Sequence, residues 1–212
     1  MNEDALARLN AVYGARDLGE LNALYAAWAA AYDSDVMRLG YQMPAMVAAM
    51  AARVLPPQAG PLLDCGAGTG MLGLLLAGLG FRDVTAIDMN EAMLQVARGR
   101  GCYRSCRRAV LGEALDFPDG AFAAALASGV FTAGHAPASA FAEIARVTRP
   151  GGFFVVGIRE DGDHAAEYRA ACGDLERQGR WRLEATSEPY RTFPLSANEA
   201  EVLNRVFVYR LA

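Results

Sequence analysis

The sequence "LLDCGAGTG", Leu62 to Gly70, places three alternate glycines directly behind a short apolar run that contains one acid. A short apolar run predicts a buried strand, and the "MLGLLLAGLG" that follows it predicts a helix. Glycine adopts positive φ and lets a ligand approach the backbone closely. Three glycines exceed what a simple strand-to-helix turn requires, so we expect a ligand at the carboxyl end of this strand.

Strands and helices alternate after this stretch, which predicts a parallel sheet with helices on both faces. The last two predicted strands follow one another without a helix, so an antiparallel strand is expected at that side of the sheet. The region before the glycines, residues 1 to about 55, is expected to be helical. The predicted strands are 62–65, 83–88, 107–111, 122–128, 153–158, 180–193 and 201–212, and the predicted helices are 21–40, 45–55, 71–80, 90–101, 136–152 and 164–179.

The composition narrows the classes of function. The chain has 212 residues and a net charge of −4, so no basic surface indicates a nucleic-acid partner. No apolar run is long enough to cross a bilayer, and the acidic start "MNEDALARLN" lacks the features of a signal peptide. We therefore expect a cytoplasmic protein without membrane contact. The four cysteines and two histidines show no standard metal-site spacing, so we expect reduced, mostly buried thiols and no metal.

The spacing of the glycines separates the ligands that such a loop can hold. A dinucleotide site has the pattern GxGxxG, but the third glycine of that pattern would fall on Met71. A phosphate-binding Walker loop needs a following Gly-Lys-Ser/Thr, which this sequence lacks. Asp88 ends the next predicted strand, where an acid accepts hydrogen bonds from both hydroxyls of a ribose. Dinucleotide enzymes share this second feature, so only the glycine spacing discriminates.

The glycines in "DCGAGTG", together with the strand-end acid in "AIDMN", resemble the class I S-adenosylmethionine (SAM) dependent methyltransferases. The motifs "FPDGAF" and "RVTRPGG" and the final strand pair extend this resemblance over essentially the whole chain. The stretches "LYAAWAAAYDSDVMRLGY", "ARGRGCY", "GVFTAGH" and "SEPYR" resemble the subgroup named for the Williams–Beuren syndrome chromosomal region. The resemblance implies a Rossmann-like, seven-stranded, mostly parallel sheet with an antiparallel last strand. It also implies a helical lid over residues 1–55, within the same domain as a SAM-binding core over residues 56–212.

The resemblance gives individual residues roles in binding SAM. Asp64 would orient the ammonium group, usually through water, Asp88 would bind the ribose hydroxyls, and Met89 would pack on the adenine. Tyr25 and Tyr32 resemble aromatic residues of a lid over SAM, with packing against the core as an equal alternative. The expected cofactor-binding residues are Tyr25, Tyr32, Asp64, Gly66, Ala67, Gly68, Gly70, Asp88, Met89, Leu111, Ser128 and Gly129.

Two positions depart from the family pattern. The loop after the third strand usually carries an acid that hydrogen-bonds the adenine amino group, and here Val110 falls at that place, with Glu113 as a substitute to test. The fourth strand contains "FAAA", so Ala123 replaces an acid. The loss of one hydrogen bond costs about 1–3 kcal/mol. We therefore expect SAM binding to be weakened roughly ten- to a hundredfold.

The methyl acceptor is expected beyond the fourth strand, near "SGVFTAGH". His135 is the candidate general base, because an unperturbed imidazole titrates near neutrality, and a surface or helix-capping role is the alternative. Phe131, Arg159 and Tyr190 are the candidate acceptor-binding residues. The alternatives are core packing for Tyr190 and a solvated loop for Arg159.

These observations together predict a methyltransferase that transfers the methyl group of SAM to an O, N or C atom of a small molecule by in-line displacement. The product of the cofactor would be S-adenosylhomocysteine (SAH). A SAM-binding or structural subunit without catalysis is the second hypothesis, which Val110 and Ala123 favour. An NAD-dependent oxidoreductase is the third, and Met71 argues against it. The sequence leaves the acceptor, the need for a general base and the oligomeric state open.

Overall fold

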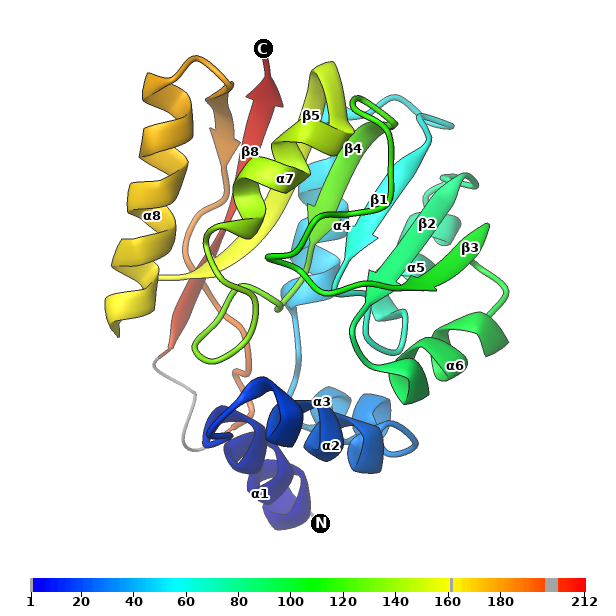
Figure 1. The fold of residues 1–212 in the computed structure, drawn as a ribbon. Coiled ribbons are helices and arrows are strands. Elements are labelled where there is room, and N and C mark those ends of the chain that lie inside the picture. Colours follow the sequence, from blue (N-terminus) through cyan, green and yellow to red (C-terminus); the bar gives the residue numbers. More distant parts are fainter. Residues whose placement is uncertain (1, 161, 197–201) are drawn as a thin grey trace.

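A computed structural model describes residues 2–160, 162–196 and 202–212. Within them, the centre of the protein is an eight-stranded sheet with the order β3-β2-β1-β4-β5-β8-β6, and β7 pairs with β8 beside this path (Figure 1). Strands β1 to β5 pair in parallel, whereas β8 runs antiparallel to β5, β6 and β7. The strands are β1 (Leu62–Cys65), β2 (Val84–Asp88), β3 (Ser105–Arg108), β4 (Phe122–Ala127), β5 (Thr148–Arg159), β6 (Trp181–Thr186), β7 (Tyr190–Arg191) and β8 (Leu203–Leu211).

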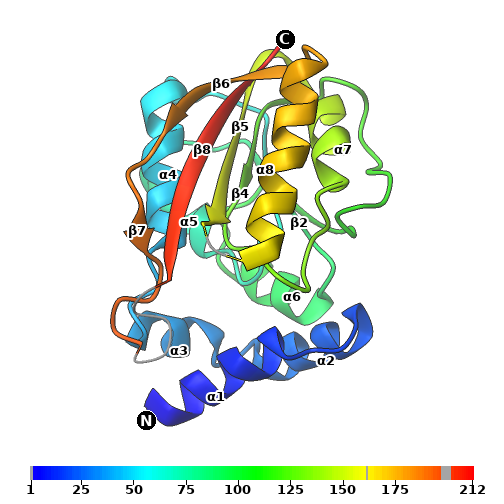
Figure 2. The same ribbon diagram turned by 90° about the vertical axis from the view of Figure 1, so that its left-hand side faces the viewer.

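Helices cover both faces of the sheet, because successive side chains of each strand point to opposite sides. Leu62 packs in one apolar cluster with residues of α4 and α5, and Leu63 packs in another with residues of α7 and α8. Figure 2 shows α4 and α8 on opposite sides of the sheet. Helix α6 packs against β2 and β3. These helices are α4 (Met43–Val54), α5 (Met71–Gly78), α6 (Glu91–Gly99), α7 (Ala140–Val147) and α8 (Gly162–Arg177).

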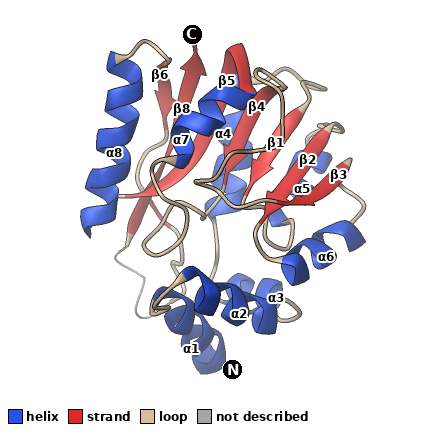
Figure 3. Cartoon of the chain, viewed as in Figure 1, coloured by secondary structure: helices blue, strands red, loops and turns tan. Residues whose placement is uncertain are grey.

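Three short helices lie beyond the carboxyl ends of the parallel strands (Figure 3), and together they are called the lid below. They are α1 (Asn2–Tyr13), α2 (Leu18–Trp28) and α3 (Tyr32–Arg38). The lid has its own apolar cluster, to which Leu9 and Trp28 belong. The buried carboxylate of Asp35 accepts hydrogen bonds from Trp28 Nε1 at 2.8 Å and from Arg8 Nη1 at 2.5 Å. One carboxylate on α3 therefore ties the three lid helices together.

The predicted α/β architecture is confirmed, with parallel strands, helices on both faces and an antiparallel strand β8. The single helix predicted over 21–40 is wrong, since α2 ends at Trp28 and α3 begins at Tyr32. The alanine-rich sequence favours one continuous helix, but the chain turns where the Ala31 N–H donates to the Trp28 carbonyl at 2.9 Å. This turn lets Asp35 reach back to Trp28, so tertiary contacts override local propensity.

The helix predicted over 136–152 is too long, because α7 ends at Val147 and residues 148–152 belong to β5. Further differences lie in the strands. The third strand ends at Arg108 rather than Leu111, because the chain leaves the sheet after the Ala109 N–H donates to the Asp88 carbonyl at 3.0 Å. The single strand predicted over 180–193 is split into β6 and β7. The predicted start of the last strand, residue 201, lies outside the described residues.

Two further features of the described chain bear on its class. Among the described residues, no helix is both long enough and apolar enough to span a bilayer. All four cysteines are free, with Cys65 and Cys172 buried and Cys102 and Cys106 partly exposed.

Helix α4 packs against the sheet rather than within the lid, so the lid proper ends before residue 43.

Candidate active site

The glycine loop joins β1 to α5 at the edge of the sheet that faces the lid. Gly66, Gly68 and Gly70 all have positive φ, at 71°, 54° and 89°. A Cβ atom on Gly66 would lie 2.5 Å from Val130 Cγ2, so the loop has no room for a side chain there. Gly70 is the N-cap residue of α5, in the left-handed conformation that glycine adopts at no steric cost. The sequence pattern therefore has a steric cause at each end of the loop.

Three adjoining cavities lie between the carboxyl ends of the strands and the lid, and the glycine loop lines two of them. Including space open to solvent, the first spans about 790 Å³, the second about 550 Å³ and the third about 320 Å³. Gly66, Gly68 and Ser128 border the first and third cavities, and Tyr25 and Gly129 border the first and second. The three spaces thus share their walls and lie side by side around the strand ends.

Asp88, at the end of β2, is held at the wall of the first cavity by backbone amides. Its Oδ2 accepts the Gly68 N–H at 2.8 Å, and its Oδ1 accepts the Asn90 N–H at 2.8 Å. Burial raises the pKa of Asp88, while these amide hydrogen bonds oppose the shift. Each carboxylate oxygen has two lone pairs, so both oxygens keep an acceptor position for the paired hydroxyls of a ribose.

Asp64, at the end of β1, borders the third cavity and is 1% exposed. Its Oδ2 accepts the Tyr103 hydroxyl at 2.6 Å. Its Oδ1 is buried and has no hydrogen-bond partner among the described residues. Burial, and to a lesser extent the neighbouring charge of Asp88, raise the pKa of Asp64 to about 7. A buried carboxylate with an unmet acceptor is the chemistry that a ligand's ammonium group requires.

The part of the first cavity that is lined by the loop after β3 is apolar. Met89 and Val110 line it together with Leu111, and the lid contributes Leu18 and Leu21. Glu113, the predicted substitute for the missing acid, is exposed and does not line a described cavity. Within the described cavities, the loop after β3 therefore offers apolar side chains to an adenine ring rather than a carboxylate.

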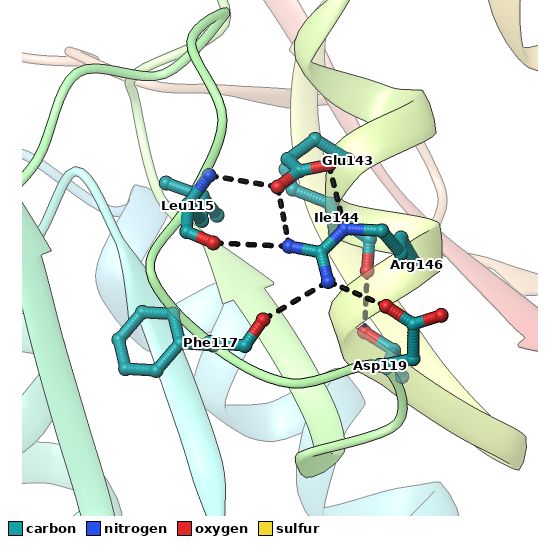
Figure 4. Close-up of polar contacts among 7 residues, drawn as sticks. Leu115, Phe117, Asp119, Glu143, Ile144 and Arg146 are labelled. Carbon is teal, nitrogen blue, oxygen red and sulfur yellow. Dashed lines mark hydrogen bonds and ion pairs between the residues drawn. The ribbon is translucent and has the colours of Figure 1, made fainter.

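A hydrogen-bond network fixes this loop to α7 (Figure 4). Arg146 donates from Nη2 to the Leu115 carbonyl at 3.0 Å and from Nη1 to the Phe117 carbonyl at 2.9 Å. Glu143 accepts from Arg146 Nε at 2.9 Å and from the Leu115 N–H at 2.7 Å. The guanidinium holds the pKa of Glu143 below its ordinary value. The motif that contains Phe117 thus anchors the loop that carries Val110.

Ala123, the second departure from the family pattern, lies away from this site. It is 3% exposed in the core, and its N–H donates to the Pro61 carbonyl at 2.7 Å, just before β1 begins. It lines none of the described cavities. The expectation that alanine at this position weakens cofactor binding is therefore not supported by the geometry.

The lid is fastened over the site by side-chain contacts. Asn90 Nδ2 donates to the Asn22 carbonyl at 2.7 Å, while its own Oδ1 caps α6 by accepting the Met93 N–H at 3.0 Å. On another side, Asp33 accepts the Thr69 hydroxyl at 2.6 Å and also pairs with Arg100. These contacts join the lid to α6 and to the glycine loop itself.

A third lid contact involves the predicted base. Tyr25 Oη lies 2.8 Å from His135 Nε2, and His135 Nδ1 lies 2.8 Å from the Ala133 carbonyl. Because a carbonyl only accepts, Nδ1 carries the proton and Nε2 of the neutral ring accepts from Tyr25. Burial lowers the pKa of His135, which favours this neutral form. His135 lines the first cavity, and its unprotonated Nε2 is already hydrogen-bonded to Tyr25 of the lid.

The second cavity has aromatic walls and several polar groups. Phe131 and Tyr41 line it, and the Tyr41 ring stacks on Phe193 at a centroid distance of 4.9 Å. Thr192 borders the same space, and its Oγ1 is buried without a hydrogen-bond partner among the described residues. The predicted acceptor residue Arg159 also lines this cavity.

The structure brings most of the predicted site residues together. Gly70 and Tyr190 line none of the described cavities: Gly70 is the N-cap residue of α5, and the Tyr190 hydroxyl donates to Met43 Sδ at 2.7 Å. The predicted residues that line the first cavity are Tyr25, Tyr32, Gly66, Gly68, Asp88, Met89, Leu111, Ser128, Gly129 and His135; Asp64 and Ala67 line the third, and Phe131 and Arg159 the second.

Sequence reasoning assigned no role to Tyr103, Asn22 or Tyr41. Tyr103 and Tyr41 fall within "ARGRGCY" and "RLGY", stretches of the subgroup resemblance, but nothing local indicates their contacts. Tyr103 reaches Asp64 across 39 positions, and Asn22 reaches Asn90 across 68. Such long-range pairs are visible only in the folded chain.

This geometry is typical of SAM-dependent methyltransferases: a glycine loop, a carboxylate at the end of β2 whose oxygens can accept paired hydroxyls, and a buried carboxylate with an unmet acceptor, all on a Rossmann-like sheet. A family profile described as a methyltransferase domain matches residues 63–156. The chain is 32% identical over 182 residues to human Methyltransferase-like protein 27, covering 82% of this chain and 74% of that protein. The chain therefore belongs to the class I SAM-dependent methyltransferases, its cofactor is SAM, and the subgroup resemblance is confirmed.

Two further comparisons agree with this assignment. The chain is 36% identical over 148 residues to the ubiquinone/menaquinone biosynthesis C-methyltransferase UbiE of Methylobacterium nodulans, covering 65% of this chain and 58% of that protein. A TehB-like SAM-dependent methyltransferase from Corynebacterium glutamicum superposes with a TM-score of 0.63 at 21% identity, covering 88% of this chain and 99% of that chain. The second similarity shows that the two chains share a fold.

Proposed function

We propose that this methyltransferase acts on a small molecule, which binds in the second cavity. The observation that carries the proposal is that this cavity adjoins the first, with Tyr25, Tyr32 and Gly129 lining both. The lid covers the carboxyl edge of the sheet, so an acceptor has to fit the confined space between the lid and the strand ends. A confined space of this kind suits a small ligand, and a net charge of −4 does not favour a nucleic acid.

The residues that would hold the cofactor lie along the first and third cavities. We assign Asp88 to the ribose hydroxyls, Asp64 to the ammonium group, and Met89 with Leu111 to the adenine ring. Bound SAM supplies a methyl group on a positively charged sulfur, which leaves as a neutral thioether. The transfer is a displacement, so the protein chiefly positions the acceptor and excludes water.

The residues of the second cavity would position the acceptor. Thr192 Oγ1 offers a buried hydrogen-bonding group, and Arg159 and Asn204 add polar groups from the adjacent strands β5 and β8. Phe131 and Tyr41 provide apolar and aromatic walls. This lining favours an acceptor with a flat apolar body and a few hydrogen-bonding groups.

A proton path leads out of this cavity through Tyr25. Its side chain borders both cavities, and its hydroxyl lies 2.8 Å from His135 Nε2. An acceptor that loses a proton on methylation would pass it to the Tyr25 oxygen, while the Tyr25 proton moves to His135. The His135 ring then carries the positive charge that the sulfur loses, so charge and protons balance.

A SAM-binding subunit without catalysis is the alternative. The observation that favours it is the apolar adenine end, where Val110 replaces the usual acid. This alternative and the enzyme make different predictions about turnover, although both require SAM to bind.

The test uses SAM labelled in its methyl group, incubated with the protein and a cell extract that has been separated by mass. Label in organic molecules below about 1 kDa, absent with Asp88→Ala, supports the proposal. Label only in protein or nucleic acid overturns the choice of acceptor class. SAH binding by calorimetry without any transfer favours the non-catalytic subunit.

A further inference from the structure

Tyr103 lies between the glycine-loop acid and the first turn of α5. Its hydroxyl donates to Asp64 Oδ2 at 2.6 Å and accepts the Gly73 N–H at 3.1 Å. Gly73 has no side chain for a steric reason, because a Cβ atom there would lie 2.2 Å from Tyr103 Cζ. The ring of Tyr103 is therefore fitted closely against the helix on one side and bonded to the acid on the other.

The Gly73 amide fixes the direction of the Tyr103 hydroxyl proton. Gly73 is in the first turn of α5, where backbone N–H groups have no partner within the helix. Since this N–H donates to the phenol oxygen, the phenol proton is left for Asp64. The partial positive charge of the helix amino terminus reinforces this polarity, so the hydroxyl stabilises a negative charge on Asp64.

Only one oxygen of Asp64 is used in this way. The other, Oδ1, is buried without a partner among the described residues, and Asp64 borders the third cavity. We propose that Tyr103 is a positioning residue for the cofactor, which holds the Asp64 carboxylate so that Oδ1 receives the ammonium group of SAM. This inference concerns the amino-acid end of the cofactor alone and does not depend on the proposed acceptor.

The electrostatics of the pair agree with this geometry. Burial raises the pKa of Asp64 to about 7, and the Tyr103 hydrogen bond opposes that rise. Without the phenol, a larger fraction of Asp64 would be protonated at neutral pH and would attract an ammonium group less. Asp88 lies near enough to raise the pKa of Asp64 further, so the carboxylate depends on Tyr103 for its stabilising partner.

The test compares two ligands with wild type, Tyr103→Phe, Asp64→Ala and the double variant by calorimetry at pH 7. SAH carries the ammonium group, whereas 5′-methylthioadenosine has the same nucleoside and sulfur but no amino-acid part. We expect Tyr103→Phe to bind SAH about tenfold more weakly and to bind 5′-methylthioadenosine within about twofold of wild type. We also expect the double variant to bind SAH no more weakly than Asp64→Ala, because Tyr103 acts through Asp64.

Equal weakening for the two ligands would overturn the proposal, as would unchanged SAH binding or additive losses in the double variant. Tyr209→Phe is the matched control, because it removes a buried hydroxyl near Trp181, far from Asp64 along the sheet. Gly73→Ala displaces the Tyr103 ring without removing its hydroxyl, so it provides a second route to the same selective loss. Circular dichroism and melting curves establish that each variant is folded before its ligands are compared.

Discussion

Replacing Asp64 with asparagine should stabilise the protein without ligand and weaken its binding of SAH. The carboxyl is 1% exposed, and burial raises its pKa from 3.8 to about 7. Asparagine has nearly the same shape and does not titrate. The substitution therefore removes a buried ionisable group while keeping a hydrogen-bond acceptor for Tyr103.

The sign of the pH effect follows from the direction of the shift. A folded-state pKa above the unfolded value means that the folded protein keeps its proton where the unfolded chain has lost it. The contribution of Asp64 to stability is complete below about pH 4 and is lost as the pH rises to about 7. Each pH unit corresponds to about 1.4 kcal/mol. Between pH 5 and pH 7, the free energy of unfolding of wild type should therefore fall by up to about 3 kcal/mol relative to that of Asp64→Asn.

Urea unfolding without ligand at pH 5, 6, 7 and 8 measures this difference directly. The advantage of Asp64→Asn over wild type should grow by about 1.5–3 kcal/mol from pH 5 to pH 8. Asp116→Asn is the matched control, because Asp116 is exposed and should show no such growth. Parallel stability curves for wild type and Asp64→Asn would refute the reasoning.

The ligand provides an independent check of the same group. At pH 6 a carboxyl with a pKa of about 7 is mostly protonated, and binding an ammonium group expels that proton. Calorimetry in two buffers of different ionisation enthalpy should give a release of nearly one proton on SAH binding at pH 6 and little at pH 8. Asp64→Asn should bind SAH weakly with no proton release, and an equal release from that variant would assign the proton to another group.

Three further predictions test other parts of the site. Asp88→Ala should weaken SAH binding at least about a hundredfold, because two charge-assisted hydrogen bonds are lost; calorimetry within threefold of wild type would contradict the ribose assignment. Tyr25→Phe removes the lid contact to His135, so stopped-flow measurements should show SAH dissociating about fivefold faster. An unchanged dissociation rate would show that this contact does not keep the lid closed. Arg146→Met should lower the free energy of unfolding by about 2–4 kcal/mol, because two loop carbonyls and Glu143 lose their donor; a loss below 0.5 kcal/mol in urea would contradict that account.

Local sequence was sufficient to predict the framework of the fold. The alternation of strands and helices follows from apolar runs and glycine or proline breaks, and β1, β2 and β4 appear where they were predicted. β5 begins at Thr148, before its predicted start at Phe153. The lid was predicted less well, because its helices end where Asp35 and Trp28 meet rather than where propensity changes. The third strand was displaced for a similar reason: Val110 and Leu111 are apolar because they line a cavity, not because they lie in the sheet.

The residues of the site likewise divide into those that local sequence predicts and those that it does not. Asp64, Asp88 and the glycines lie within 25 positions of one another, and the parallel pairing of β1 with β2 places Asp88 beside the glycine loop. Tyr103 and Asn22 could not be predicted, because their partners are distant in sequence and their own neighbourhoods carry no distinctive pattern. Their discovery depends on the packing of α2 and of the chain after α6 around the glycine loop.

The missing acid at position 110 has a physical explanation in the arrangement of the lid. An adenine amino group can be recognised by a carboxylate where the carboxylate keeps some contact with water. Here Leu21 of the lid lines that end of the cavity together with half-buried Val110 and Leu111, while Leu18 remains 44% exposed. An ionised acid there would lose part of its hydration without an arginine or lysine among the residues that line the first cavity. Apolar burial contributes roughly 25 cal/mol for each Å² removed from water, so a ring bound there would be held by contact area where the family pattern relies on one hydrogen bond.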